Sequence, residues 1–234
     1  KTSGNGVAIE EWLKYASSES LSYFMYQKPK TAKRLHFEII PKMVDEYHQQ
    51  LRAYSGQDFL GKLNNPVWHI HGNSVPNSHM AIPFSMLLNL ASVSGAEEKG
   101  TLWGFIKRYQ SEASPETHPD LDQAVGFAVA FYNDFVKPKK IYREADELER
   151  EAIIDLRNKL SDYEGDLDAE SLQSIVFSCG RERFDPLRKW FQALYEILLG
   201  ASQGPRFGGF IALYGIEETI ALIDSALDGQ FCTN

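Results

Sequence analysis

The chain has 234 residues, of which 43% are hydrophobic and 24% are charged. These values are typical of a folded globular protein and exclude a wholly disordered chain. No apolar run approaches the roughly 20 residues that a membrane-spanning helix needs, and no segment resembles a signal peptide. Only two cysteines occur, Cys179 and Cys232, which argues against a disulfide framework and favours a reducing, cytoplasmic location.

The net charge is −8, from 24 basic and 32 acidic residues, and this total alone argues against nonspecific binding of nucleic acid. The charge is uneven, however, because the stretch 144–170 is strongly acidic whereas basic side chains gather in two groups. The first group consists of Lys28, Lys30, Lys33, Arg34 and Lys42, and the second of Arg181, Arg183, Arg188, Lys189 and Arg206. Local basic faces of this kind are compatible with nucleic-acid binding despite the acidic total.

Apolar residues at helical spacing predict helices along most of the chain. The pattern predicts short helices around 9–13 and 18–25, followed by a long amphipathic helix over 35–51. The stretch 61–83 is rich in Pro, Gly, Asn and Ser, and we interpret it as a linker or long loop. Within it, residues 67–70 are compatible with a short extended segment.

Helical patterns resume after residue 83 and continue nearly to the end of the chain. They cover 84–93, 102–109, 121–131, 146–163, 169–179, 186–199 and 216–227. His118-Pro119-Asp120 is typical of a helix start, and Gly165 and Gly200 are natural helix ends. Because alternating strand patterns are nearly absent, the sequence predicts an all-α fold with ten or more helices.

Two histidines, His69 and His71, suggest a zinc site at first sight, with His79 as the nearest third ligand. A pair of histidines alone is a weak signal, and we favour a structural role for both. Cys179 follows the apolar positions of its predicted helix, so we expect a buried structural thiol.

The acidic stretch 146–170 contains enough carboxylates for a catalytic pair, but a charge run is usually the solvated face of a helix. The sequence contains no phosphate-binding loop, no dinucleotide fingerprint and no nucleophile elbow. We therefore expect no complete active site and no bound cofactor or metal in this chain.

Basic and aromatic residues mix at 188–195, and a glycine-rich turn follows at 204–209. Aromatic rings and arginines are the groups that recognise single-stranded bases, by stacking and by hydrogen bonds to base edges. The alternative is that Trp190 and its helical neighbours belong to the core, and that Phe207 packs the last helix in place. Sequence patterning alone favours this alternative.

Short segments spread over nearly the whole chain carry a further indication. They are SGNG at 3–6, EWL at 11–13, YAS at 15–17, ESL at 19–21, FMYQKP at 24–29, NPVWHIHG at 65–72, LLNLA at 87–91, WFQALY at 190–195, GPRFG at 204–208 and YG at 214–215. Together and in this order they resemble the C-terminal region of class I lysyl-tRNA synthetases.

In that family a Rossmann catalytic domain with a HIGH-type motif ends at a KMSKS-type loop, and Lys1 and Thr2 resemble the last two positions of this loop. The His69-Ile70-His71-Gly72 segment is not the HIGH motif, since it follows the loop. The resemblance implies a helical stem-contact region over 1–63. It implies an α-helix cage over 64–234 that receives the anticodon of tRNA-Lys.

The resemblance thus implies the tRNA-binding part of a ligase that joins lysine to tRNA-Lys using ATP, inactive without its catalytic domain. We expect the anticodon to contact Arg206, Phe207, Trp190, Lys189 and Arg188. We expect the tRNA backbone to contact Lys28, Lys30, Lys33 and Arg34. Two alternatives remain: a helical protein–protein scaffold that uses the acidic face 146–170, and a metal hydrolase built on His69, His71 and His79.

Overall fold

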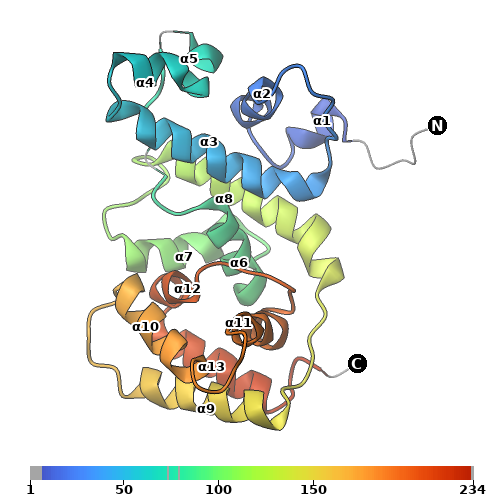
Figure 1. Ribbon diagram of the computed structural model, residues 1–234, viewed down its shortest axis with the longest axis vertical. Helices are drawn as coiled ribbons and strands as arrows, with labels where there is room; N and C mark the ends of the chain where they lie inside the picture. The colour runs from blue at the N-terminus through green and yellow to red at the C-terminus, as the bar shows by residue number, and fades with distance from the viewer. Residues whose placement is uncertain (1–6, 73, 79, 233–234) are drawn as a thin grey trace, which may run out of the picture. The chain divides into compact units, whose positions relative to one another are not determined.

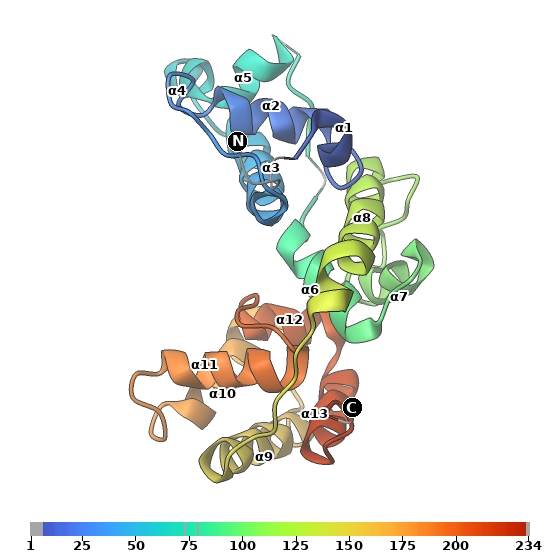
Figure 2. The ribbon, with the colours of Figure 1, turned by 90° about the vertical axis from the view of Figure 1, so that its right-hand side faces the viewer.

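The computed structural model describes residues 7–72, 74–78 and 80–232. All regular secondary structure in these residues is helical, which confirms the all-α prediction. The chain divides into two compact units (Figures 1 and 2), the first formed by Lys1–Leu88 and Ser114–Phe131 and the second by Asn89–Ala113 and Tyr132–Asn234. The functional division expected at residues 63 and 64 falls inside the first unit and stays a prediction.

The first unit is built around one long amphipathic helix, α3 (Ile40–Ser55), against which α2 and α5 pack. Its other helices are α1 (Ile9–Trp12), α2 (Ser18–Tyr26), α4 (Phe59–Asn64), α5 (Pro66–His71), the beginning of α6 (Phe84–Ser94) and α8 (Pro119–Phe131). A short 3-10 turn, Phe37–Ile39, precedes α3, so the helix predicted from residue 35 starts later.

The apolar face of α3 is the one that the spacing predicts. It buries Ile40, Met43, Val44, Tyr47 and Leu51. The last two join Tyr23 and Val67 in a buried cluster, so three helices share one core. Asp45, on the same helix, accepts hydrogen bonds from the backbone N–H groups of Phe84 (2.5 Å) and Ser85 (3.2 Å), and thereby caps the N-terminus of α6.

The interpretation of 61–83 as a loop is wrong in its first part, because this part contains the end of α4 and the whole of α5. The prediction of an extended segment at 67–70 is also wrong, because these residues lie within α5. The side chain of Asn65 accepts a hydrogen bond from the N–H of Val67 (3.0 Å), and Pro66 occupies the first helical position. A six-residue helix shows too little periodicity to be recognised, and the burial of Val67 stabilises it.

The second unit contains the end of α6, then α7 (Lys99–Tyr109), α9 (Glu147–Ser161), α10 (Ala169–Gly180), α11 (Arg188–Leu194), α12 (Phe207–Tyr214) and α13 (Ile216–Leu227). Short π-helical segments follow α8 (Tyr132–Val136) and α11 (Tyr195–Leu199), and a 3-10 turn covers Lys137–Lys139. Helix α10 packs on α9 and α12. Gly200 ends the α11 segment with a φ of +63°, as predicted. Gly165 does not end a helix, since α9 already stops at Ser161.

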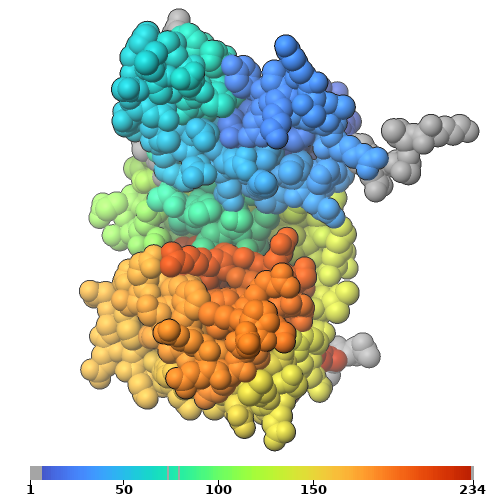
Figure 3. All heavy atoms as spheres, viewed as in Figure 1, coloured from blue at the N-terminus to red at the C-terminus, as the bar shows by residue number. Residues whose placement is uncertain are grey.

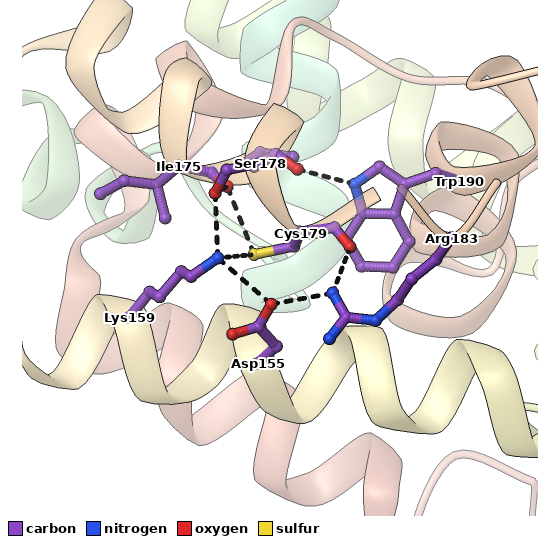
Figure 4. A network of polar contacts seen from close by, with 8 residues as sticks. Asp155, Lys159, Ile175, Ser178, Cys179, Arg183 and Trp190 are labelled. Carbon is purple, nitrogen blue, oxygen red and sulfur yellow. Dashed lines mark hydrogen bonds and ion pairs between the residues drawn. The ribbon is translucent and has the colours of Figure 1, made fainter. Parts of the chain in front are cut away.

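A network of polar contacts joins α9, α10 and the segment that leads into α11 (Figure 4). Asp155 accepts from Lys159 (3.2 Å) and from Arg183 (3.0 Å), which also donates to the carbonyl oxygen of Cys179 (2.8 Å). The Cys179 thiol is buried and lies 3.7 Å from the Lys159 ammonium. The prediction that Cys179 is buried is confirmed, and this burial raises the pKa of its thiol.

Most carboxylates of the acidic stretch 146–170 are exposed, as expected for a solvated helix face. Asp155 is half-buried, and Glu149 is buried: it is 8% exposed and receives two hydrogen bonds from Arg143, at 2.6 and 2.7 Å. These contacts lower the pKa of Glu149. No helix of the described residues is long and apolar enough to cross a membrane.

Candidate RNA-binding surfaces

Trp190 and Phe207, the two rings expected at the anticodon, are both fully buried in the second unit. The indole N–H of Trp190 donates to the carbonyl oxygen of Val176 (2.9 Å). A Cβ at Gly180 would lie 2.3 Å from the Trp190 ring, so the glycine is what allows this packing. Phe207 contacts the rings of Phe210 and Tyr195. Their burial favours the core alternative, and a direct role in anticodon binding stays a prediction for both.

The glycine-rich turn before α12 serves helix packing. The N–H of Gly208 donates to Oε1 of Gln173 (2.8 Å), and a Cβ at Gly208 would lie 2.3 Å from the carbonyl oxygen of Ala169. Helix α12 therefore approaches the backbone of α10 at a distance that only glycine allows. The Tyr195 hydroxyl donates to the carbonyl oxygen of Pro205 (2.7 Å) and holds the turn in place.

Arg206, in contrast, is exposed, as are Arg188 and Lys189 on α11. The Arg206 guanidinium donates two hydrogen bonds to the Glu170 carboxylate, at 2.8 and 3.0 Å. The two side chains are 62% and 72% exposed. Exposed pairs of this kind contribute little to stability, so Arg206 can exchange its partner at low cost.

Two phenylalanine rings lie at the surface of α10 and α11: Phe191 belongs to the basic and aromatic cluster predicted at 188–195, whereas the sequence pattern did not single out Phe177. Phe177 on α10 is 39% exposed and meets the half-buried Phe191 on α11 edge-on, with ring centroids 5.2 Å apart. Glu170, Phe177 and Arg181 recur at helical spacing and are all exposed, so they share one side of α10. Arg188 lies one turn before Phe191 on α11.

We call this surface the α10–α11 face. It consists of Glu170, Ser174, Phe177, Arg181, Arg188, Phe191 and Arg206. In Figure 3 the segment that carries most of it (orange) lies on the surface that faces the viewer. The sequence held one signal for this face: Phe177 is apolar but lies outside the buried stripe of Leu172, Val176 and Cys179 on α10.

The basic group of the first unit divides into free and engaged side chains. Lys28, Lys30 and Arg34 are exposed. The Lys33 ammonium instead hydrogen-bonds the carbonyl oxygens of Phe24 and Met25 at the end of α2 and lies 4.9 Å above the Phe24 ring. Burial, and then the nearby charge of Lys28, lower the pKa of Lys33. The Lys33 ammonium therefore satisfies backbone carbonyl groups at the C-terminus of α2.

His69 and His71 lie on a helix and have different partners. A ring nitrogen of His69 donates to the carbonyl oxygen of Leu63 (2.8 Å), and His71 hydrogen-bonds the Tyr47 hydroxyl (2.9 Å). No group of three potential metal ligands occurs among the described residues, and His79 lies outside them. These contacts give the metal-hydrolase alternative no support.

A cavity of about 420 Å³ lies within the first unit. Its lining includes Glu19, Tyr47, His48, His71 and Asp120. Burial lowers the pKa of His48 to about 4 and also lowers the pKa of His71, so both rings are neutral at pH 7. The remaining formal charges in the lining are two carboxylates, which disfavour an anionic ligand such as a nucleoside triphosphate.

Comparisons with known proteins agree with the resemblance drawn from the sequence segments. A family model described as "tRNA synthetases class I (K)" matches residues 1–74. The chain is 70% identical over all 234 residues to the lysine–tRNA ligase of Roseobacter denitrificans. It is 43% identical over 230 residues, 97% of its length, to those of Rickettsia conorii and Rickettsia felis. In each case it covers 44% of the relative, so the chain spans less than half the length of these proteins. With such identity along its entire length, the chain belongs to the class I lysyl-tRNA synthetase family.

Proposed function

We propose that this chain is the tRNA-binding part of a cytoplasmic ligase that attaches lysine to tRNA-Lys. The names of its relatives supply the reaction, and the 70% identity over the whole chain supports the transfer. The observation that carries RNA binding is the α10–α11 face, which presents a pair of phenylalanine rings in contact with each other together with three exposed arginines.

The chemistry of this face suits unpaired nucleotides. Bases stack on accessible rings, and the planar guanidinium group bonds base edges or phosphates through two parallel N–H groups. We assign the anticodon to this face, with Arg206 and Arg188 as polar contacts and Lys189, the exposed neighbour of Arg188 on α11, as a further one. Phe177 and Phe191 take the stacking role first expected of Trp190 and Phe207, because rings at the surface can stack without any change in the core.

The first unit supplies the backbone contacts in this proposal. Lys28, Lys30 and Arg34 are exposed and face no acidic partner among the described residues, so their charge is available to phosphates. Lys33 contributes to the local potential but is held at the end of α2. Such contacts fix the position of an RNA without reading its sequence.

ATP and lysine belong to the reaction of the longer protein in this proposal. The sequence contains no phosphate-binding loop, and the cavity described above in the first unit is lined by two carboxylates, so we assign this chain no ATP site. The purified chain should therefore show no lysine-dependent exchange between ATP and pyrophosphate. Exchange by a preparation free of host synthetase would overturn this assignment.

A fluorescence-anisotropy titration tests the binding function. The ligands are a tRNA-Lys transcript and the same transcript with a substituted anticodon, each measured over a series of salt concentrations. We expect tighter binding of the first transcript and an affinity that falls as salt rises. Absence of binding at every salt concentration would remove the proposed function and leave the protein scaffold as the remaining candidate. Equal affinity for both transcripts would remove only the anticodon assignment.

A further inference from the structure

Three rings form a small platform at the surface of the first unit. Tyr26, the last residue of α2, stacks on His69 of α5 with ring centroids 5.2 Å apart and planes 16° apart. Trp68 meets His69 edge-on at 4.9 Å. We call Tyr26, Trp68 and His69 the ring platform. Tyr26 is 42% exposed and His69 is exposed as well, so the platform is open to solvent.

The ring platform is ordered before any ligand arrives. The hydrogen bond from His69 to the carbonyl oxygen of Leu63 (2.8 Å) fixes the imidazole, and the imidazole supports Tyr26. Tyr26 follows the buried residues Tyr23 and Phe24 of the same helix, so its backbone is held. A ring that is already positioned loses little conformational entropy when a second ring stacks on it.

A rigid turn places positive charge directly after Tyr26. Lys28 has a φ of +49° and is the one non-glycine residue with positive φ in the described part of the chain. Pro29 follows, and the N–H of Thr31 donates to the carbonyl oxygen of Lys28 (3.0 Å). Residues other than glycine adopt this conformation rarely, and such positions concentrate at functional sites. The turn displays Lys28 and Lys30 on the surface.

The charge around the ring platform is positive. The Lys33 ammonium lies 3.3 Å from the carbonyl oxygen of Met25, next to Tyr26, and the Lys28 charge is close enough to lower the pKa of Lys33. The Glu46 carboxylate, close to the neighbouring Gln27, already accepts a hydrogen bond from that side chain (3.0 Å) and pairs with Lys42 (3.7 Å). Flat rings beside free cations match a nucleotide, which has a flat base and an anionic phosphate.

We propose that the ring platform binds one unpaired nucleotide of an RNA, with the base stacked on Tyr26 and the adjacent phosphates paired with Lys28 and Lys30. This inference rests on the proposed function, and it adds to the first unit a site that requires an unpaired base. A base inside a duplex is covered on both sides by its neighbours, so only a nucleotide in a loop, a bulge or a single-stranded end can occupy the platform.

The test compares Tyr26→Ala with Tyr109→Ala, a tyrosine of the second unit that is exposed to nearly the same extent, 43%. The probes are a tRNA-Lys transcript and a blunt-ended RNA duplex of similar length, titrated with the 234-residue chain. Tyr26→Ala should weaken tRNA binding by roughly ten-fold and leave duplex binding within about two-fold, because only the base stacking is removed. Lys28→Ala should weaken binding of both ligands. Tyr109→Ala should change neither.

Two conservative variants separate stacking from folding. Tyr26→Trp keeps a flat ring and should retain tRNA binding, whereas Tyr26→Leu keeps apolar bulk and should bind as weakly as Tyr26→Ala. Thermal melting of each variant identifies any unfolding. The ring platform is overturned if the wild-type chain binds tRNA and Tyr26→Leu, folded, binds it equally well; the proposed function then stands. If the wild-type chain binds no tRNA at any salt concentration, the proposed function fails first and the inference with it.

Discussion

Arg206 and Glu170 form a two-bond ion pair in which both side chains lie at the surface of the second unit. Glu170 lies on α10, and Arg206 lies in the turn before α12, 36 positions later in the chain. In the absence of RNA, this pair neutralises the arginine that was expected at the anticodon. Glu170 therefore competes with any anionic or base-edge partner of Arg206.

This competition predicts opposite effects from the two halves of the pair. Glu170→Gln should tighten tRNA-Lys binding a few-fold, since it releases Arg206 and removes a negative charge, while Arg206→Ala should weaken binding. Neither variant should change the free energy of unfolding by more than about 1 kcal/mol, because exposed pairs contribute little. Anisotropy titrations and thermal melts give both quantities. Tighter binding by Arg206→Ala would contradict the assignment.

A second prediction concerns the two phenylalanines of the α10–α11 face. Phe177→Ala and Phe191→Ala should each weaken binding of tRNA-Lys by about 1–3 kcal/mol if one base stacks on each ring. Their effect on binding of an RNA duplex should be small, and Ile154→Ala, an exposed apolar residue on α9, is the matched control. Unchanged tRNA affinity in both folded variants would exclude the α10–α11 face as a stacking surface.

Substitutions of the buried rings Trp190 and Phe207 should affect stability rather than tRNA binding. Trp190→Ala and Phe207→Ala should each lower the free energy of unfolding by about 3–5 kcal/mol, since each leaves a large cavity in the core. Gly180→Ala should also destabilise the chain, because its Cβ would collide with the Trp190 ring. Denaturant titrations measure these changes. A Phe207→Ala variant with wild-type stability and no anticodon discrimination would return Phe207 to the binding site.

Substitutions in the basic group of the first unit should have two different effects, one on the salt dependence of RNA binding and the other on stability. Lys28→Ala, Lys30→Ala and Arg34→Ala should each reduce the slope of log Kd against log salt by somewhat under one unit, as expected when one cation no longer pairs with a phosphate. Lys33→Met should instead lower Tm, because the carbonyl oxygens of Phe24 and Met25 at the end of α2 then have no ammonium partner. A reversed pattern, with the largest salt effect at Lys33, would show that its ammonium leaves the helix end on binding.

His48 should make the chain sensitive to mild acid. Its folded-state pKa of about 4 lies below the ordinary value of 6.5, so the unfolded chain takes up a proton first as pH falls. The stability that neutral His48 contributes is present above pH 6.5 and disappears between pH 6.5 and about 4. Over this range the free energy of unfolding of the wild type should fall by up to about 3 kcal/mol more than that of His48→Gln.

Urea titrations at several pH values test this difference. Burial raises the pKa of Asp45, which acts in the opposite direction, but Asp45 is common to both proteins and cancels in the comparison. His69→Gln, at an exposed histidine, is the control. Parallel pH profiles for the wild type and His48→Gln would show that His48 titrates normally.

The amphipathic helices show how much of the fold follows from local pattern. The spacing that predicted 216–227 matches α13 residue for residue, and the buried face of α3 is the one its apolar residues define. These elements are long, so periodicity and helix ends specify them without tertiary information. Helix α5 was missed because it has six residues and depends on an Asn65 cap and on the burial of Val67.

For the candidate site, too, some features follow from the sequence and others only from tertiary packing. Sequence alone determined the helical class, the family and the two basic groups, because charge and motif order are properties of the chain itself. It did not determine which aromatic rings face solvent. Trp190 and Phe191 are adjacent, yet one is fully buried against Gly180 and the other is half-buried and meets the exposed Phe177. Only tertiary packing decides this, since the direction of each ring depends on where α10 crosses its neighbours, and that crossing is set by residues far apart in the chain.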